Sequence, residues 1–164
     1  MMIQTERLTL SHLDETDADF MLALLNSQGF LSYIGDRGVR TQQQAVEYIL
    51  DGPVKSYREN GFGMYRVQLK ATGDIVGLCG LVKRPQLEHV DIGYALLPEY
   101  FGQGYAIEAC VAVMQEAKEK NIHPVVAIVD SNNGPSISLL KKLGLRFHST
   151  IKLSPDDSSV DLYR

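Results

Sequence analysis

The stretch from residue 100 to residue 106 limits what this chain can fold into more than any other part of it. It reads Tyr-Phe-Gly-Gln-Gly-Tyr-Ala and lies between a predicted strand and the longest predicted helix. Gly102 and Gly104 can adopt positive φ and let a ligand approach the backbone closely. The first N–H groups of the following helix have no partner within that helix and lie at the positive end of its dipole. This order of elements indicates a site for a phosphate or pyrophosphate.

Two other interpretations fit the same glycines. The first is a plain turn that leads into a helix and binds nothing. The second is a dinucleotide-binding fold, because Gly102-x-Gly104 begins the fingerprint of such folds. The third glycine of that fingerprint would fall at Ile107, whose side chain would obstruct contact between helix and strand. The preceding strands also resemble a meander rather than a βαβ unit. The dinucleotide interpretation is therefore disfavoured, while the plain turn stays open.

Composition narrows the class of protein. The chain has 164 residues, 45% hydrophobic and 22% charged, which fits a single globular domain over 1–164. A net charge of −4 argues against a nucleic-acid partner. The longest apolar runs, such as 75–82, are too short to cross a bilayer, so we expect no membrane partner. The N-terminus lacks a signal-peptide pattern, and the two cysteines cannot make a disulfide framework or a metal site. We therefore predict a cytoplasmic protein without a bound metal.

Hydrophobic periodicity predicts the elements in the order β-α-α-β-β-β-α-β-α-β-β. Strands are expected at 6–12, 64–70, 75–82, 89–97, 125–129, 145–150 and 160–163. A first helix should follow Asp17, and a second should follow the capping box of Thr41 and Gln44 and end or kink at Gly52-Pro53. A loop at 30–40 should join these two helices. Further helices are expected at 105–121 and from Pro135 to Leu143. The predicted fold class is α+β, with a mostly antiparallel central sheet.

The helix predicted at 105–121 carries an apolar stripe. Its members are Ile107, Cys110, Val111, Met114 and Ala117, and we expect this stripe to face the core. Glu108, in the first turn of the helix, is interpreted as a surface residue favoured by the helix dipole.

Three segments together resemble the GCN5-related N-acetyltransferase (GNAT) family. Residues 91–98 followed by 102–106 look like its motif A, whose core pattern is Arg/Gln-x-x-Gly-x-Gly/Ala, with Phe101 here at the first position. Asn133-Gly134-Pro135-Ser136, continuing to Leu145, is similar to motif B. The opening Thr5-Glu6-Arg7-Leu8-x-Leu10 and the turn at 72–77 resemble the branch that acetylates the N-termini of ribosomal proteins. That branch usually has an arginine where this chain has Ser11.

The resemblance implies a GNAT-type fold, with helices on both faces of the sheet and acetyl-CoA bound as co-substrate between two splayed strands. The cofactor-binding residues that it implies are Leu96, Leu97, Gly102, Gln103, Gly104, Tyr105, Ala106, Ile107, Asn133 and Ser136. The amides of 103–107 would hold the pyrophosphate. The free strand edge near Leu96 and Leu97 would pair with the pantetheine arm and offer an N–H to the thioester oxygen.

Two side chains are candidate catalytic residues. Asp91, at a position that is often acidic in the family, would accept the proton of the amine. The alternative is a solvent-facing carboxylate that orients substrate or pairs with a cation. Many family members use a tyrosine of motif B as the acid, but Leu140 stands at that position. Ser136 is then the candidate donor to the CoA sulfur, or else an ordinary serine at a helix start. Asn133 is either a helix N-cap or a contact to the pantetheine amides.

The predicted function is transfer of an acetyl group from acetyl-CoA to a primary amine by direct attack on the thioester. The acceptor is a protein N-terminus or a small molecule, and the first two helices with the loop at 30–40 would wall its cleft. The alternative is a non-catalytic acyl-CoA binder or sensor that keeps the cofactor loop. We also expect a homodimer.

Overall fold

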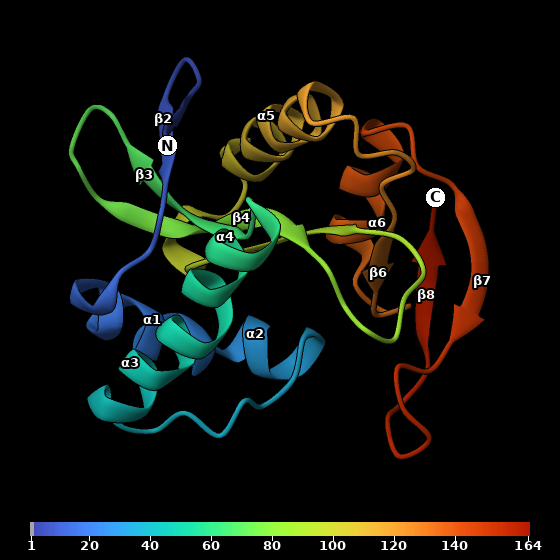
Figure 1. Cartoon of the computed structure of the whole chain (residues 1–164), viewed down its shortest axis with the longest axis horizontal. Helices are drawn as coiled ribbons and strands as arrows, with labels where there is room; N and C mark the ends of the chain where they lie inside the picture. The colour runs from blue at the N-terminus through green and yellow to red at the C-terminus, as the bar shows by residue number, and fades with distance from the viewer. Residues whose placement is uncertain (1) are drawn as a thin grey trace.

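Two antiparallel sheets, joined at one point, carry the strands of this protein (Figure 1). The computed structural model describes residues 2–164. The first sheet has its strands in chain order: β1 (Met2–Gln4), β2 (Leu8–Ser11), β3 (Met64–Leu69), β4 (Ile75–Val82) and β5 (Asp91–Leu96). The second has the order β6-β8-β7, from β6 (Ala127–Val129), β7 (Phe147–Ile151) and β8 (Val160–Tyr163). The strand positions agree with the sequence prediction except for β1, which has no alternating pattern long enough to be detected.

Helices cover both faces of the first sheet (Figure 1). One face packs against α5 (Tyr105–Glu119) through a core that includes Val67, Cys79 and Val113. The other face packs against a layer of α1 (Ala18–Leu25), α2 (Gln28–Tyr33), α3 (Gln42–Ile49) and α4 (Lys55–Asn60). The remaining helix, α6 (Gly134–Lys142), lies next to β6. This arrangement confirms the predicted α+β fold. No helix among residues 2–164 is long and apolar enough to cross a membrane.

Local sequence signals explain where several helices begin. The Thr41 hydroxyl accepts the Gln44 N–H, and the Gln44 side chain binds the N–H of Thr41 in return, which confirms the predicted capping box. The first helix begins directly after Asp17, as predicted, but the Asp17 side chain makes no capping hydrogen bond to it. A 3-10 turn at Glu15–Asp17 comes first, and Asp14 caps it, while the buried Asp17 carboxylate accepts the Asp14 N–H and pairs with Arg66 at 3.0 Å.

The structure corrects three sequence predictions in detail. Of the two outcomes expected at Gly52-Pro53, an end or a kink of the helix, the end does not occur. The chain stays helical through a π-helical turn at Leu50–Val54, which accommodates the missing N–H of Pro53, and continues into α4. Part of the loop expected at 30–40 is helical, because α2 reaches Tyr33. Val111 is exposed, since the face of α5 that meets the sheet is formed by Ala109, Cys110, Val113 and Ala117.

Two glycines that face each other across β4 and β5 differ in the space around them. Gly80 pairs in register with both Met64 and Gly93. A Cβ on Gly80 would lie 2.0 Å from the Gly63 carbonyl oxygen and 2.7 Å from the Met64 Cα, both backbone atoms. A Cβ on Gly93 would approach only the flexible end of Met64, at 3.9 Å. The sheet therefore requires a glycine at position 80 and not at position 93.

We expect Gly80→Ala to lower the free energy of unfolding by about 3 kcal/mol or more, because the strands must separate to accept the methyl group. Gly93→Ala, the matched control, should change it by less than about 1 kcal/mol. Urea denaturation of the two variants and the wild type measures both values. Equal stability of the two variants would contradict the packing described for β3 and β4.

Candidate active site

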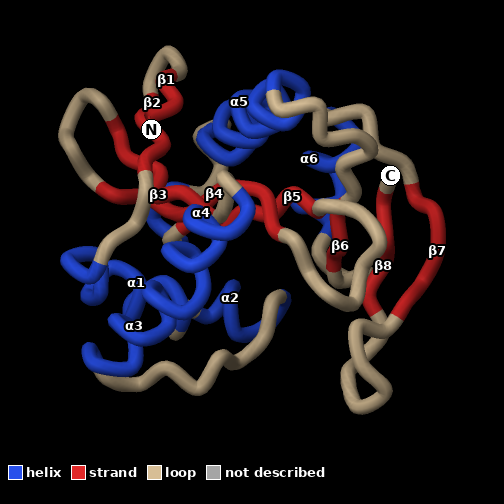
Figure 2. Tube along the Cα trace, in the orientation of Figure 1, coloured by secondary structure: helices blue, strands red, loops and turns tan. Residues whose placement is uncertain are grey.

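The two sheets separate between β5 and β6 (Figure 2). These strands are parallel neighbours at one end only, where the Ile92 N–H donates to the Val126 carbonyl and the Val126 N–H donates to the Val90 carbonyl, both at 2.9 Å. Successive residues of a strand direct their backbone groups to alternate edges. Tyr94 and Leu96 therefore present theirs to the gap, as Ile92 does. This free edge is what an extended ligand needs to bind as an added strand.

The free edge differs from the sequence prediction at one residue. The Leu97 N–H donates to the Val76 carbonyl of β4 at 2.9 Å and is therefore not available at the gap. Of the two residues predicted there, only Leu96 has its N–H on the open side. Alternation along β5 decides this, because Leu96 and Leu97 necessarily face opposite edges.

A groove of about 1950 Å³ runs along this gap and under α2. All of the predicted cofactor-binding residues line it except Leu97 and Gln103, and so do Asp91 and Ser136. Its other wall includes α2 and the segment that follows it, with Tyr33, Ile34 and Arg37. Among residues 2–164, no group of three or more His, Cys, Asp or Glu side chains could hold a metal ion.

The loop from β5 to α5 adopts the conformation that its glycines allow. Gly102 has φ 76° and Gly104 has φ 80°, both in the left-handed region, and Gly104 is the N-cap of α5. Within the described part of the chain, the N–H groups of residues 103–107 donate to no acceptor. These amides can therefore bind an anion at the start of a 15-residue helix. Phe101, at the first position of the motif, is exposed.

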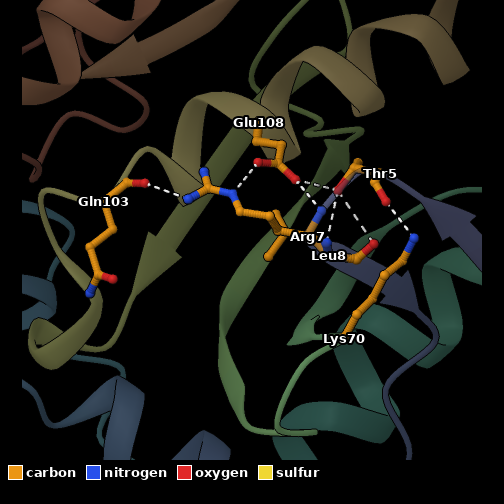
Figure 3. Close-up of polar contacts among 6 residues, drawn as sticks. All are labelled: Thr5, Arg7, Leu8, Lys70, Gln103 and Glu108. Atoms are coloured by element: carbon orange, nitrogen blue, oxygen red, sulfur yellow. Dashed lines mark hydrogen bonds and ion pairs between the residues drawn. The ribbon is translucent and has the colours of Figure 1, made fainter.

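An ion-pair network joins this loop to the N-terminal segment (Figure 3). The Nε of Arg7 donates to Glu108 at 2.7 Å, and its Nη1 donates to the Gln103 carbonyl at 2.9 Å. The other Glu108 oxygen accepts the Thr5 hydroxyl at 2.6 Å and the Arg7 N–H at 2.9 Å. The interpretation of Glu108 as a mere surface residue is wrong, because its carboxylate links α5 to the residues before β2. Sequence could not reveal this pairing across some hundred residues.

Asp91 begins β5 and is almost completely buried, with a residue exposure of 1%. Arg84, which follows β4, donates to its carboxylate through Nε at 3.1 Å. Burial raises the pKa of Asp91 to about 6, and the Arg84 guanidinium opposes this shift. The alternative of a solvent-facing carboxylate is therefore wrong, although pairing with a cation is confirmed. Sequence reasoning missed Arg84, which no motif marks.

Ser136 lies in the first turn of α6, beside the tyrosine of β5. Its N–H donates to the Asn133 side chain at 3.3 Å, which confirms Asn133 as a helix N-cap. Burial raises the pKa of Tyr94, and hydrogen bonding with the Ser136 side chain opposes this shift. Tyr94 and Ser136 both line the groove, so a tyrosine hydroxyl is available on the Ser136 side of it although Leu140 occupies the tyrosine position of motif B. The alternating pattern of β5 already placed Tyr94 on one face, but nothing in the sequence paired it with Ser136.

The candidate groups approach the gap from opposite faces of the sheet. Tyr94 packs into the core on the α5 side, whereas Ala95 packs into the core of the α1–α4 layer. Asp91 has the same parity as Ala95 in β5, and its register partner Val82 keeps that parity, so its side chain faces the α1–α4 layer. A group held in the gap would have Asp91 on one side and the Tyr94–Ser136 pair on the other.

Comparison with known proteins agrees with this geometry. The family model described as "Acetyltransferase (GNAT) domain" matches residues 7–146. The uncharacterized protein YkkB of Bacillus subtilis is 27% identical over 153 residues, covering 90% of this chain and 87% of that protein. The uncharacterized N-acetyltransferase YnaD of the same organism is 26% identical over 147 residues, covering 89% and 83%. The structure of RimL, a ribosomal L7/L12 alpha-N-protein acetyltransferase in complex with coenzyme A, has a similar fold, with a TM-score of 0.83 and 17% identity over 99% of this chain and 96% of that one. This chain belongs to the GNAT acetyltransferase family.

Proposed function

We propose that this protein transfers the acetyl group of acetyl-CoA to a primary amine, either a protein N-terminus or a small molecule. The family uses acetyl-CoA as its co-substrate. The observation that carries the proposal is the free edge of β5, which leads directly to a loop whose amides have no acceptor. The fold relative named as a ribosomal-protein N-terminal acetyltransferase supports a protein N-terminus as one acceptor class. A cytoplasmic location and a homodimer stay predictions from the sequence.

In this proposal, different residues that line the gap bind different parts of the cofactor. The amides of 103–107 bind the pyrophosphate, since they are the unpaired donors at the positive end of α5. The backbone of Tyr94 and Leu96 pairs with the amides of the pantetheine arm. A backbone N–H of this edge also faces the thioester oxygen, where negative charge develops in the transition state.

The reaction needs one proton removed and one returned. The amine nitrogen attacks the thioester carbon, a C–N bond forms, and the C–S bond breaks to leave a thiolate. Asp91, ionised above a pH of about 6, accepts the proton of the amine directly or through water. The hydroxyl pair of Ser136 and Tyr94 hydrogen-bonds the departing sulfur and returns a proton to it. Much of the rate enhancement comes from holding the two reactants together.

The central test combines CoA binding with transfer. Wild-type protein should bind CoA in a calorimetric titration and release free thiol from acetyl-CoA with at least one member of a panel of N-terminal peptides and small amines. Gly104→Val should weaken CoA binding by at least about tenfold, because valine resists φ 80° and its Cβ would lie 3.3 Å from the Arg7 Nη2, so the loop must shift to accept it.

Gly61→Val is the matched control for backbone strain. Gly61 has φ 76° and open space around it, and it lies outside the groove, so this variant should lose stability but keep its CoA affinity. Normal CoA binding by folded Gly104→Val would refute the loop assignment. CoA binding without thiol release for any amine would favour the non-catalytic binder.

Ser136→Ala should lower kcat by roughly tenfold to a thousandfold while changing the dissociation constant of acetyl-CoA less, because the hydrogen bond strengthens as charge builds on sulfur. Tyr94→Phe should act in the same direction, and the double variant should lose less than the product of the two single effects, since both hydroxyls serve one sulfur. Steady-state kinetics and CoA titrations measure these effects. A change confined to CoA affinity would assign Ser136 to binding rather than to proton transfer.

Asp91→Asn should remove the dependence of kcat/KM on pH that arises from ionisation of the Asp91 carboxyl group. Wild-type kcat/KM should rise as the pH passes about 6, where Asp91 loses its proton, and the variant should lack this rise. At neutral pH the variant should be slower, and it should recover in part at higher pH as free amine becomes abundant.

Stability provides an independent check of the same group. The folded pKa of Asp91, about 6, exceeds the ordinary value of 3.8, so the folded state binds this proton more tightly than the unfolded state does. Wild type should therefore lose up to about 3 kcal/mol of unfolding free energy relative to Asp91→Asn as the pH rises from 4 to 7. A pH-independent difference in stability, together with identical rate profiles, would exclude Asp91 as the base.

A further inference from the structure

The loop proposed to bind the pyrophosphate contains no basic side chain. Residues 100–107 include neither lysine nor arginine, and Phe101 occupies the position where the motif has a basic or amide residue. The cation that reaches this loop comes from another part of the chain. Arg7, just before β2, donates to the Gln103 carbonyl (Figure 3). Its guanidinium also lies over the Tyr105 ring, 4.5 Å from the ring centroid.

The bond to the Gln103 carbonyl has a direct consequence for the amide that follows. A trans peptide directs its C=O and N–H to opposite sides. With the Gln103 carbonyl turned toward Arg7, the Gly104 N–H must point away from Arg7. Gly104 lines the groove, and the Arg7 Nη2 lies only 3.3 Å from where a Cβ of Gly104 would be. By binding the Gln103 carbonyl, Arg7 therefore sets the orientation of the Gln103–Gly104 peptide and with it the direction of the Gly104 N–H.

The second contact of Arg7 concerns charge. Glu108 lies one turn after the N-cap of α5, so its carboxylate is close to any anion bound at the start of that helix and would repel it. The Nε of Arg7 binds this carboxylate at 2.7 Å, and the other carboxylate oxygen accepts two further donors. The negative charge is therefore compensated where it would oppose pyrophosphate binding.

We propose that Arg7 is the positioning residue of the cofactor loop: it fixes the Gln103–Gly104 peptide so that its N–H faces the groove, and it neutralises Glu108. This inference rests on the proposed role of residues 103–107. If the Arg7–Glu108 ion pair were purely structural, its loss would change only stability. The proposed role instead predicts that Arg7 affects the affinity for the pyrophosphate part of CoA.

The test compares the CoA affinity of five proteins at a temperature well below their midpoints of unfolding. Arg7→Ala should raise the dissociation constant of CoA about tenfold. Arg7→Lys should lie between Arg7→Ala and wild type, because one ammonium can face Glu108 but cannot also span to the Gln103 carbonyl. Adding Glu108→Gln to Arg7→Ala should restore part of the affinity, because the uncompensated carboxylate is then gone.

The fifth protein, Arg66→Gln, is the control. It breaks the ion pair with the buried Asp17 carboxylate, which lies outside the groove, so it should lower the midpoint of unfolding without changing the CoA affinity. Pantetheine, which lacks the pyrophosphate, should bind wild type and Arg7→Ala equally when titrated by NMR. Arg7→Ala and Arg7→Lys that bind CoA as wild type does would overturn the inference while leaving the proposed function intact. A wild type that fails to bind CoA would overturn both.

Discussion

The parting of β5 from β6 is the constraint on which the rest of this structure depends. The backbone link between the two sheets is one pair of hydrogen bonds at Ile92 and Val126, beside a hydrophobic core that both sheets share. Beyond these hydrogen bonds, the backbone groups of Tyr94 and Leu96 on that edge have no strand to bind. Unpaired polar groups within a fold must find a partner in water or a ligand, so this edge is able to pair with an extended chain that carries amide groups. The groove, the loop and the candidate catalytic groups are all arranged around it.

The loop from β5 to α5 depends on distant parts of the chain as well as on its own glycines. Left-handed φ values at Gly102 and Gly104 turn the backbone into α5, but the Gln103 carbonyl is held by Arg7 from the N-terminal segment. That segment is in turn part of the first sheet, through β2 and its pairing with β3. The conformation of the loop therefore depends on the segment before β2, which is separated from β5 in the sheet by β3 and β4, as well as on its neighbours in the chain.

The two faces of β5 carry different titratable side chains, a carboxylate on one face and a tyrosine hydroxyl on the other. Alternation places the Asp91 carboxylate toward the helical layer α1–α4, which also borders the groove, and places Tyr94 toward α5 and α6. Burial is the leading cause of the pKa shift at both residues: it raises the pKa of Asp91 to about 6 and that of Tyr94 above its usual value. Asp91 and Tyr94 therefore lie on opposite faces of one strand, each in a buried environment that disfavours its charged form.

The sequence by itself predicted the fold class, every strand except β1, the glycine turn that leads into α5 and the capping box at Thr41, because these depend on periodicity and on contacts within a few residues. It left Asn133 open between a helix N-cap, which the structure shows, and a contact to the cofactor. It also predicted that Asp91 and Ser136 border one site, through motifs that span the chain. Only the tertiary structure decided that α3 continues past Pro53, that Val111 faces outward, and that the Leu97 N–H belongs to β4. The same holds for the pairing of Arg7 with Glu108, of Arg84 with Asp91, and of Tyr94 with Ser136. Each of these outcomes depends on which surfaces meet when distant segments pack, and no local pattern specifies that.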